Sequence, residues 1–207
     1  MKQMLESSDY TVFWDILDSA NFGIPQSRPR LYMVCFFNES MEIDEFCFTE
    51  KICKKTSLRE YLNYGDYSIP ISDRWNEYID LYTNKITEDQ VSFELPKTRR
   101  HLERIGKNCD LDDCVFQIRS SGIRAYSLDE PFPTFAVSNS GGGAMIPVLS
   151  KERRHLNLLE MKRIMGFPDN FDLTCVSRTD AIKQLANAVC PPVIVSICGD
   201  IKRAISG

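Results

Sequence analysis

Three polar residues in a proline-rich stretch have the chemistry to recognise oxygen atoms. Gln26, Arg28 and Arg30 alternate in the segment IPQSRPR. A guanidinium group presents a planar fork of N–H donors that suits phosphate and carbonyl oxygens. Pro25 and Pro29 fix φ and provide no N–H donor, so the segment should be stiff. The sequence therefore predicts a rigid loop that holds both arginines in place; the alternative is a pair of surface arginines that follow a turn.

The cysteines are a second source of chemistry, as nucleophiles or as metal ligands. No two of them form a C-x-x-C pair, and the chain has only 2 histidines, so the spacing of a zinc site is absent. Several lie in apolar runs without a neighbouring histidine or basic cluster. We therefore expect no metal site, and buried, unreactive thiols in a cytoplasmic protein. The 8 cysteines are Cys35, Cys47, Cys53, Cys109, Cys114, Cys175, Cys190 and Cys198.

The segment around the arginines has the pattern of a β-hairpin. Val12, Trp14 and Ile16 occupy alternate positions, which predicts a strand with one buried face. Residues 31–37, LYMVCFF, form a continuous apolar run and predict a strand that is buried on both faces. We therefore expect two strands joined by the stiff loop.

The middle of the chain predicts two short helices and then a small β-rich lobe. Ser57 and Glu60 have capping-box spacing, and Ser72 is placed to cap a second helix. Residues 97–145 are basic and rich in turn residues, which favours short strands. Gly141 to Gly143 lack the Lys-Ser/Thr of a phosphate-binding loop and predict a hinge. The second helix carries a core-packing stripe of Trp75, Tyr78, Ile79 and Tyr82.

Capping and stop signals predict three helices in the C-terminal part. Residues 157–166 begin with an Asn-x-x-Glu capping box and end with glycine. Thr179 or Asp180 can cap the next helix. Two prolines at 191–192 suit the first turn of the last helix. That helix has an apolar residue at every fourth position: Val193, Ile197, Ile201 and Ile205.

The chain has a net charge of −4, but its charges are unevenly distributed. Residues 1–96 contain 9 basic and 17 acidic side chains, whereas residues 97–163 contain 12 basic and 8 acidic ones. The middle segment is therefore a candidate for contact with an anionic partner, although an ordinary solvated surface gives the same pattern. No apolar run approaches the ~18 residues of a membrane span, and the N-terminus has no signal-peptide core, so we expect no membrane partner.

Three motifs, in this order, resemble the C-terminal half of the cytosine-5 DNA methyltransferases. NFGIPQSRPRLYMVCF at 21–36 is similar to the family's Gln-x-Arg-x-Arg motif and the strand after it. RHLNLLEMKRIMGFPDNF at 154–171 resembles its Gly-Phe-Pro-Asp motif. AIKQLANAVCPPVIVSI at 181–197 resembles its Gln-x-Gly-Asn-x-Val motif. The three motifs are distributed over most of the length of the chain.

The resemblance implies an α/β fold made of two partial units. Residues 1–40 and 146–207 would form the C-terminal part of a Rossmann-like methyltransferase domain, as a β-hairpin plus C-terminal helices. Residues 41–145 would form an inserted, small β-rich target-recognition lobe. The implied activity is DNA cytosine-5 methylation that depends on S-adenosylmethionine, with double-stranded DNA as the substrate.

The motifs of the family's front half do not occur in this sequence. They are a Phe-x-Gly-x-Gly loop for the methyl donor, a Pro-Cys dipeptide whose thiolate attacks cytosine C6, and Glu-Asn-Val. We therefore expect a C-terminal subunit or fragment, inactive without a complementary N-terminal subunit or segment. The alternatives are a non-catalytic, DNA-binding remnant of a truncated methyltransferase and an RNA-directed relative.

The resemblance assigns roles to residues of the first and third motifs. Arg30 would donate to the cytosine O2, and Arg28 would support the catalytic pocket. Gln26 would anchor the loop. Asn187 and Ala188 would lie at the S-adenosylmethionine site, most of which belongs to the missing half. Two members of the second motif, Arg154 and Glu160, are expected to be structural.

The same resemblance makes the basic lobe the part that contacts DNA. Family enzymes flip the target cytosine out of the duplex and recognise flanking bases with this lobe. Arginine pairs with guanine and glutamine with adenine in the major groove. Lys97, Arg99, Arg100 and Lys107 are expected to contact phosphate or solvent. The expected DNA-binding residues are Gln117, Arg119, Ser121, Arg124 and Thr134.

Overall fold

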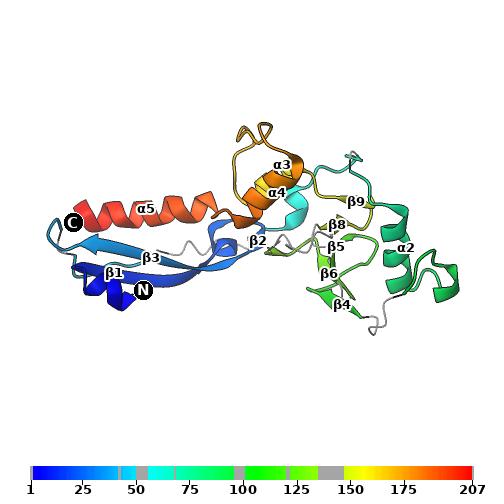
Figure 1. Cartoon of the computed structure of the whole chain (residues 1–207), viewed down its shortest axis with the longest axis horizontal. Coiled ribbons are helices and arrows are strands. Elements are labelled where there is room, and N and C mark those ends of the chain that lie inside the picture. The colour runs from blue at the N-terminus through cyan, green and yellow to red at the C-terminus, as the bar shows by residue number, and fades with distance from the viewer. Residues whose placement is uncertain are drawn as a thin grey trace.

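The structure is a computed structural model with an α/β fold. Figure 1 shows an elongated molecule with a long β-hairpin and the last helix at one end, close to both termini, and a small sheet at the other. Two further helices lie between these ends (Figure 1). The described residues are 2–41, 43–49, 56–67, 69–95, 101–119, 122–134 and 147–206.

The predicted hairpin is present. Strands β1 (Tyr10–Asp18) and β3 (Pro29–Phe37) pair antiparallel, from Tyr10 opposite Phe37 to Asp18 opposite Pro29. One face buries Leu17, Val34 and Phe36 in the main core. The short helix α1 (Lys2–Glu6) precedes β1.

The predicted burial of the hairpin was wrong in two respects. Trp14 and Ile16 are exposed, although they share a strand face with the buried Val12. In β3 only Val34 and Phe36 are buried, so this strand is not covered on both faces. The described residues form only a two-stranded sheet here, and no second layer covers most of its other face.

The loop between the strands contains a 3-10 turn, η1 (Ser19–Phe22), and a short strand, β2 (Gln26–Ser27). Gly23 adopts a φ of 77°, which glycine reaches without steric cost, and so ends η1. Strand β2 pairs in parallel with β7 (Phe132–Pro133), a short strand that follows β6 in the sequence. The loop is therefore tied to a segment more than a hundred positions later in the sequence.

The predicted β-rich lobe is present as a five-stranded sheet. Helix α2 (Asp73–Tyr82) packs beside it, with Tyr78, Ile79 and Tyr82 buried in the lobe core as predicted. The sheet continues past residue 145, because its last two strands come from the segment after the proposed boundary. Its strand order is β4 (Leu102–Ile105), β6 (Gly122–Ser127), β5 (Cys114–Arg119), β8 (Val148–Leu149) and β9 (Arg154–His155).

Short 3-10 turns replace the first predicted helix. Ser57 caps η2 (Leu58–Tyr61) by accepting from the Arg59 N–H, so the predicted start is confirmed but the element is only one turn long. A further turn, η3 (Glu88–Gln90), follows α2.

Helix α3 (Leu158–Ile164) has the predicted capping box, in which Asn157 and Glu160 each accept from the other's backbone N–H. Gly166 ends it with a φ of 78°. Helix α4 (Arg178–Asn187) is capped by Ser177, so the prediction of Thr179 or Asp180 was wrong.

Helix α5 (Pro191–Ser206) begins at the predicted prolines. Val193 and Ile197 are buried, whereas Ile205 is exposed. Residues spaced by four drift about 40° around a helix at each step, so the predicted stripe turns away from the core. Asp200 is buried on this helix, and its carboxylate pairs with Arg203.

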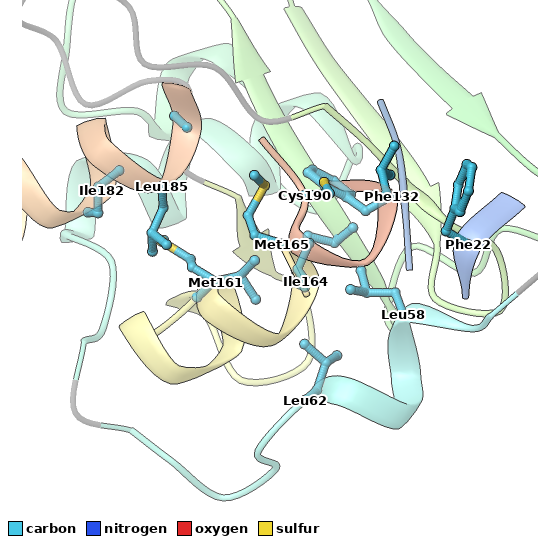
Figure 2. Close-up of a cluster of buried hydrophobic side chains, with 14 of the residues drawn as sticks. Phe22, Leu58, Leu62, Phe132, Met161, Ile164, Met165, Ile182, Leu185 and Cys190 are labelled. Atoms are coloured by element: carbon cyan, nitrogen blue, oxygen red, sulfur yellow. The ribbon is translucent and has the colours of Figure 1, made fainter. Parts of the chain in front are cut away.

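The main core lies where the hairpin loop, the exit from the lobe and the C-terminal helices meet. Figure 2 shows side chains from η1, η2, β7, α3 and α4 converging there. Both proposed domains therefore contribute side chains to this main core, and the lobe core is a second, separate cluster. The labelled members are Phe22, Leu58, Leu62, Phe132, Met161, Ile164, Met165, Ile182, Leu185 and Cys190.

One stretch in the described part, Arg178–Ser206, is long and apolar enough by length and composition to cross a membrane. It is divided into α4 and α5, and Val193 and Ile197 pack in the main core. Packing accounts for its apolar character, so this stretch is weak evidence for a membrane span.

Candidate functional site

Asp18 organises the loop that carries the arginines. Its Oδ1 accepts from the Ala20 N–H at 3.1 Å and from the Arg28 N–H at 2.7 Å. Its Oδ2 accepts from the Ser27 hydroxyl at 2.7 Å. Sequence reasoning missed this residue, although an Asp that precedes a turn of small residues is a recognisable capping signal. One carboxylate thus fixes both ends of the loop.

Arg28 connects the loop to the C-terminal helices. It is buried, and its Nη2 donates to the Ala186 carbonyl at 2.7 Å and to the Ala188 carbonyl at 3.1 Å. Both acceptors lie at the C-terminal end of α4, where helical carbonyls lack intrahelical partners. Burial, and then the charge of Arg30, lower the pKa of Arg28. Its Nε and Nη1 have no hydrogen-bond partner within the described chain.

Arg30 is exposed at the start of β3. Its Nη1 donates to the neighbouring Pro29 carbonyl at 2.7 Å. The remaining N–H donors of Arg30 are accessible to another molecule. Two arginines separated by one residue therefore differ sharply: one is built into the fold and the other faces outward.

Gln26 is held by its backbone rather than by its side chain. The Ser19 hydroxyl donates to the Gln26 carbonyl at 2.6 Å. The side chain is 0% exposed, and neither amide atom finds a partner in the described residues. A buried polar group without a partner is costly, so this site favours a further polar group from outside the described chain.

Thr134 lies beside the arginine loop. Its hydroxyl donates to the Ser27 carbonyl at 3.0 Å, directly after the β2–β7 pairing. The structure thus brings together residues from the first and third motifs and from the lobe: Arg28, Thr134 and the end of α4. The three glycines, Gly141 to Gly143, lie outside the described residues.

Asn187 and Ala188 lie at the end of α4, next to Arg28. Asn187 is exposed, and its amide could donate to or accept from a bound molecule. The Ala188 carbonyl already accepts from Arg28. Exposed Val189 adds an apolar surface. These residues fit the edge of an S-adenosylmethionine site, with one polar side chain and one apolar one.

The expected DNA-binding residues of the lobe do not form one exposed set. Gln117 is 1% exposed and accepts from the Tyr126 hydroxyl at 3.4 Å, so its side chain does not face a solvent groove. Arg124 donates to Glu103 at 2.6 Å, and this hydrogen bond raises the Arg124 pKa. Arg119 ends β5, while its side chain and Ser121 lie outside the described part. We therefore leave Gln117 out of the proposed DNA surface.

Arg154 and Glu160 form a buried ion pair, as expected for structural residues. Two hydrogen bonds of 2.8 Å join the guanidinium to the Glu160 carboxylate, and Glu152 accepts a third at 2.7 Å. Burial alone would lower the pKa of Arg154, but the two carboxylates outweigh it and raise the pKa. The Asn63 N–H also donates to Glu160, so this network joins the segment after η2 to β9 and α3.

The expectation that all the cysteines are buried was wrong. Cys47, Cys175 and Cys198 are exposed, and Cys35 is half-buried. Burial raises the pKa of the Cys190 thiol, which lies near Arg28 but stays protonated at neutral pH. The other buried thiols are Cys109 and Cys114, and Cys53 lies outside the described residues. Among the residues that the structure describes, no cluster of His, Cys, Asp or Glu could hold a metal ion.

Two solved structures share the fold of this chain. A putative DNA modification methyltransferase encoded within an E. coli prophage superposes with a TM-score of 0.57 at 16% identity, over 97% of this chain and 62% of that one. The Entamoeba histolytica methyltransferase EhMeth gives a TM-score of 0.56 at 17% identity, over 97% and 56%. These similarities concern the fold alone.

The family follows from the sequence comparisons. The model of the C-5 cytosine-specific DNA methylases matches residues 1–203, so the chain belongs to this family. It is 28% identical to the type II methyltransferase M.NlaX of Neisseria lactamica, over 98% of this chain and 56% of the relative. It is 27% identical to M.HhaI of Haemophilus parahaemolyticus, over 100% and 58%. The chain thus spans little more than half the length of these relatives.

Proposed function

We propose that this chain supplies the DNA-binding and base-positioning part of a DNA cytosine-5 methyltransferase. The observation that carries the proposal is the junction around Arg28. This residue hydrogen-bonds the end of α4, and the adjacent Ser27 accepts from Thr134 of the lobe. These contacts support the proposal because they join the proposed base-binding loop to the proposed recognition lobe and to the proposed edge of the cofactor site.

In this proposal, residues 1–40 and 146–207 form the C-terminal part of the catalytic domain. Residues 41–145 form the target-recognition lobe, whose sheet is completed by β8 and β9. The complementary N-terminal subunit or segment carries the Pro-Cys nucleophile and the Phe-x-Gly-x-Gly loop. It lies either on the same polypeptide or on a second one.

The residues of this chain position the flipped cytosine. Arg30 donates to the base O2 and stabilises the negative charge that develops when a thiolate adds to C6. Arg28 keeps the loop fixed against α4. The backbone that carries Arg30 is therefore already in place before the substrate binds, and no ordering cost is paid at that step. Asn187 contributes one polar contact at the cofactor edge. S-adenosylmethionine, when bound, supplies the methyl group.

The lobe would hold the DNA through phosphate and base contacts. Arg119, Ser121 and Arg124 remain the proposed base-reading residues, and Thr134 the proposed backbone contact. To read a base, Arg124 would give up its hydrogen bond to Glu103 and donate to guanine instead. At sites without a guanine in this position, Arg124 would stay paired with Glu103, which would disfavour binding there.

A methylation assay with duplex DNA and labelled S-adenosylmethionine tests the proposal. The purified chain alone should transfer no methyl groups, and it should gain activity with a polypeptide that carries Pro-Cys and Phe-x-Gly-x-Gly. Activity of the chain alone would contradict the requirement for a complementary half. Salt-dependent duplex binding without methylation under any pairing would identify a non-catalytic remnant. Tighter binding to tRNA than to duplex DNA would identify an RNA-directed relative.

A further inference from the structure

One face of the two-stranded hairpin is apolar over most of its length. The cross-strand register places the two residues of each directly opposed pair on the same face. We name the face that points away from α5 the outer face. The pair Asp18 and Pro29 ends this face beside the loop, and the rest of the face is uncharged: Tyr10, Val12, Trp14, Ile16, Leu31, Met33, Cys35 and Phe37.

A continuous part of the outer face is uncovered. Trp14 is 53% exposed, Ile16 59% and Leu31 58%. Ile16 and Leu31 are directly opposed, and Trp14 lies two positions along the same strand. An antiparallel sheet with one wet face normally places polar residues on that face. The uncovered part of the outer face instead consists of apolar residues.

The covered parts of the hairpin indicate what would complete it. The inner face buries Leu17, Val34 and Phe36 in the core that also contains α5 residues. On the opposite side, Figure 1 shows the short helix α1 beside β1, and Val12 is buried. A helical layer therefore begins on the outer face but covers only one end of it.

We infer that the outer face docks the complementary methyltransferase segment, through an amphipathic helix that lays its apolar stripe over Trp14, Ile16 and Leu31. This inference rests on the proposed function, since that function requires the segment. Two facts favour this occupant over another molecule. The matched relatives contain further sequence beyond the 56% or 58% that this chain covers. Sheets of the α/β class bury both faces under helices.

The test uses the full chain and the polypeptide from the same DNA locus that carries Pro-Cys and Phe-x-Gly-x-Gly. The double variant Trp14→Thr/Ile16→Thr removes the apolar surface and places threonine, a residue that favours strands, at both positions. It should bind that polypeptide at least tenfold more weakly than the wild type, and its own unfolding midpoint should not fall. The matched control is Tyr67→Thr, which removes an aromatic side chain that is 66% exposed and belongs to the segment after η2 rather than to the hairpin. This control should bind like the wild type.

A fluorescence measurement gives an independent readout. In a Trp75→Phe variant, Trp14 is the remaining tryptophan. Its emission should shift to the blue and become resistant to iodide quenching when the complementary polypeptide is added. Duplex DNA alone should leave the Trp14 emission unchanged.

The outcomes separate the docking inference from the proposed function. Unchanged binding and methylation by the double variant would overturn the docking inference and leave the proposed function intact. Binding that depends on Trp14 and Ile16 without methylation by the wild-type pair would uphold docking and contradict the proposed function. Dimerisation of the chain through Trp14, seen by sedimentation and lost in the double variant, would overturn the docking inference in favour of a second copy. No binding by the wild-type pair would contradict both.

Discussion

The Nη2 atom of Arg28 lies 2.7 Å from the carbonyl oxygen of Ala186, 158 positions later in the sequence. This bond, with a second to Ala188, connects the hairpin loop to the corner between α4 and α5. Arg28 is therefore part of the fold as well as part of the proposed site.

Replacing the two loop arginines should separate stability from activity. Arg28→Met leaves the buried Ala186 carbonyl unpaired and should lower the free energy of unfolding by about 2 kcal/mol. Arg30→Met changes an exposed side chain and should cost less than about 0.5 kcal/mol. In the complete enzyme, however, Arg30→Met should lower methylation at least about 100-fold. Urea denaturation and a methylation assay measure the two effects; equal destabilisation by both variants would contradict this division of roles.

Removing the Glu160 carboxylate should be one of the most damaging polar changes in the chain. Glu160→Gln leaves the buried Arg154 with only one carboxylate partner, Glu152, and should cost about 3 kcal/mol. The control Lys183→Gln breaks an exposed pair with Asp180 and should cost less than about 0.5 kcal/mol. Chemical denaturation of both variants compares them. Costs of similar size would mean that the buried pair is not a central element of stability.

Gly166 is required both by its backbone conformation and by the lack of space for a side chain. A comparison with Gly65 separates these two reasons. Its φ is 78°, and an added Cβ would lie 2.5 Å from Ile24 Cδ1 and 2.8 Å from Pro192 Cδ. Gly166→Ala should therefore cost about 3 kcal/mol through backbone strain and a steric clash. Gly65 has a φ of 82°, but a Cβ added there would meet nothing within 4 Å, so Gly65→Ala should cost only about 1 kcal/mol. The loss of unfolding free energy in Gly166→Ala minus the loss in Gly65→Ala measures the cost of the clash. Equal losses in the two variants would exclude a clash at Gly166.

Thiol labelling should follow burial. At neutral pH, Cys47, Cys175 and Cys198 should react with a maleimide within minutes, since they are exposed. Burial raises the pKa of Cys114 to about 12 and also raises that of Cys190, so both thiols stay protonated and unreactive in the folded chain. Mass spectrometry of labelled peptides, with and without denaturant, makes the comparison. Rapid labelling of Cys190 in the folded protein would instead indicate an accessible thiol beside Arg28.

The starts and ends of helices could be predicted from the sequence, because capping and stop signals act between residues that are close in the chain. The capping box at Asn157, the stop at Gly166 and the prolines that begin α5 act over a single helical turn, and all three are confirmed. The hairpin was also predictable, because two apolar strands flank one stiff loop.

Features that depend on distant contacts could not be predicted in this way. The parallel pairing of β2 with β7 joins two-residue strands, which are too short to show a periodic pattern. The burial of Gln117 results from its place in the lobe core, and its residue type alone favours the surface. In the candidate site, Arg28 and Arg30 were identified from their chemistry. Arg28 is buried because it packs against the end of α4, whereas Arg30 stays exposed. The sequence of the loop contains no information about this distant contact.

The bonds of Asp18 have a consequence for the order in which the site is built during synthesis. Asp18 and Arg28 are ten positions apart, and loops of this size close in roughly 10–100 ns. The loop can therefore take its shape as soon as it leaves the ribosome. The Arg28 guanidinium must wait until α4 has been translated, which at about 5–20 residues per second takes on the order of ten seconds or more. The arginine loop is thus shaped early and anchored late, and in the interval Arg28 remains hydrated.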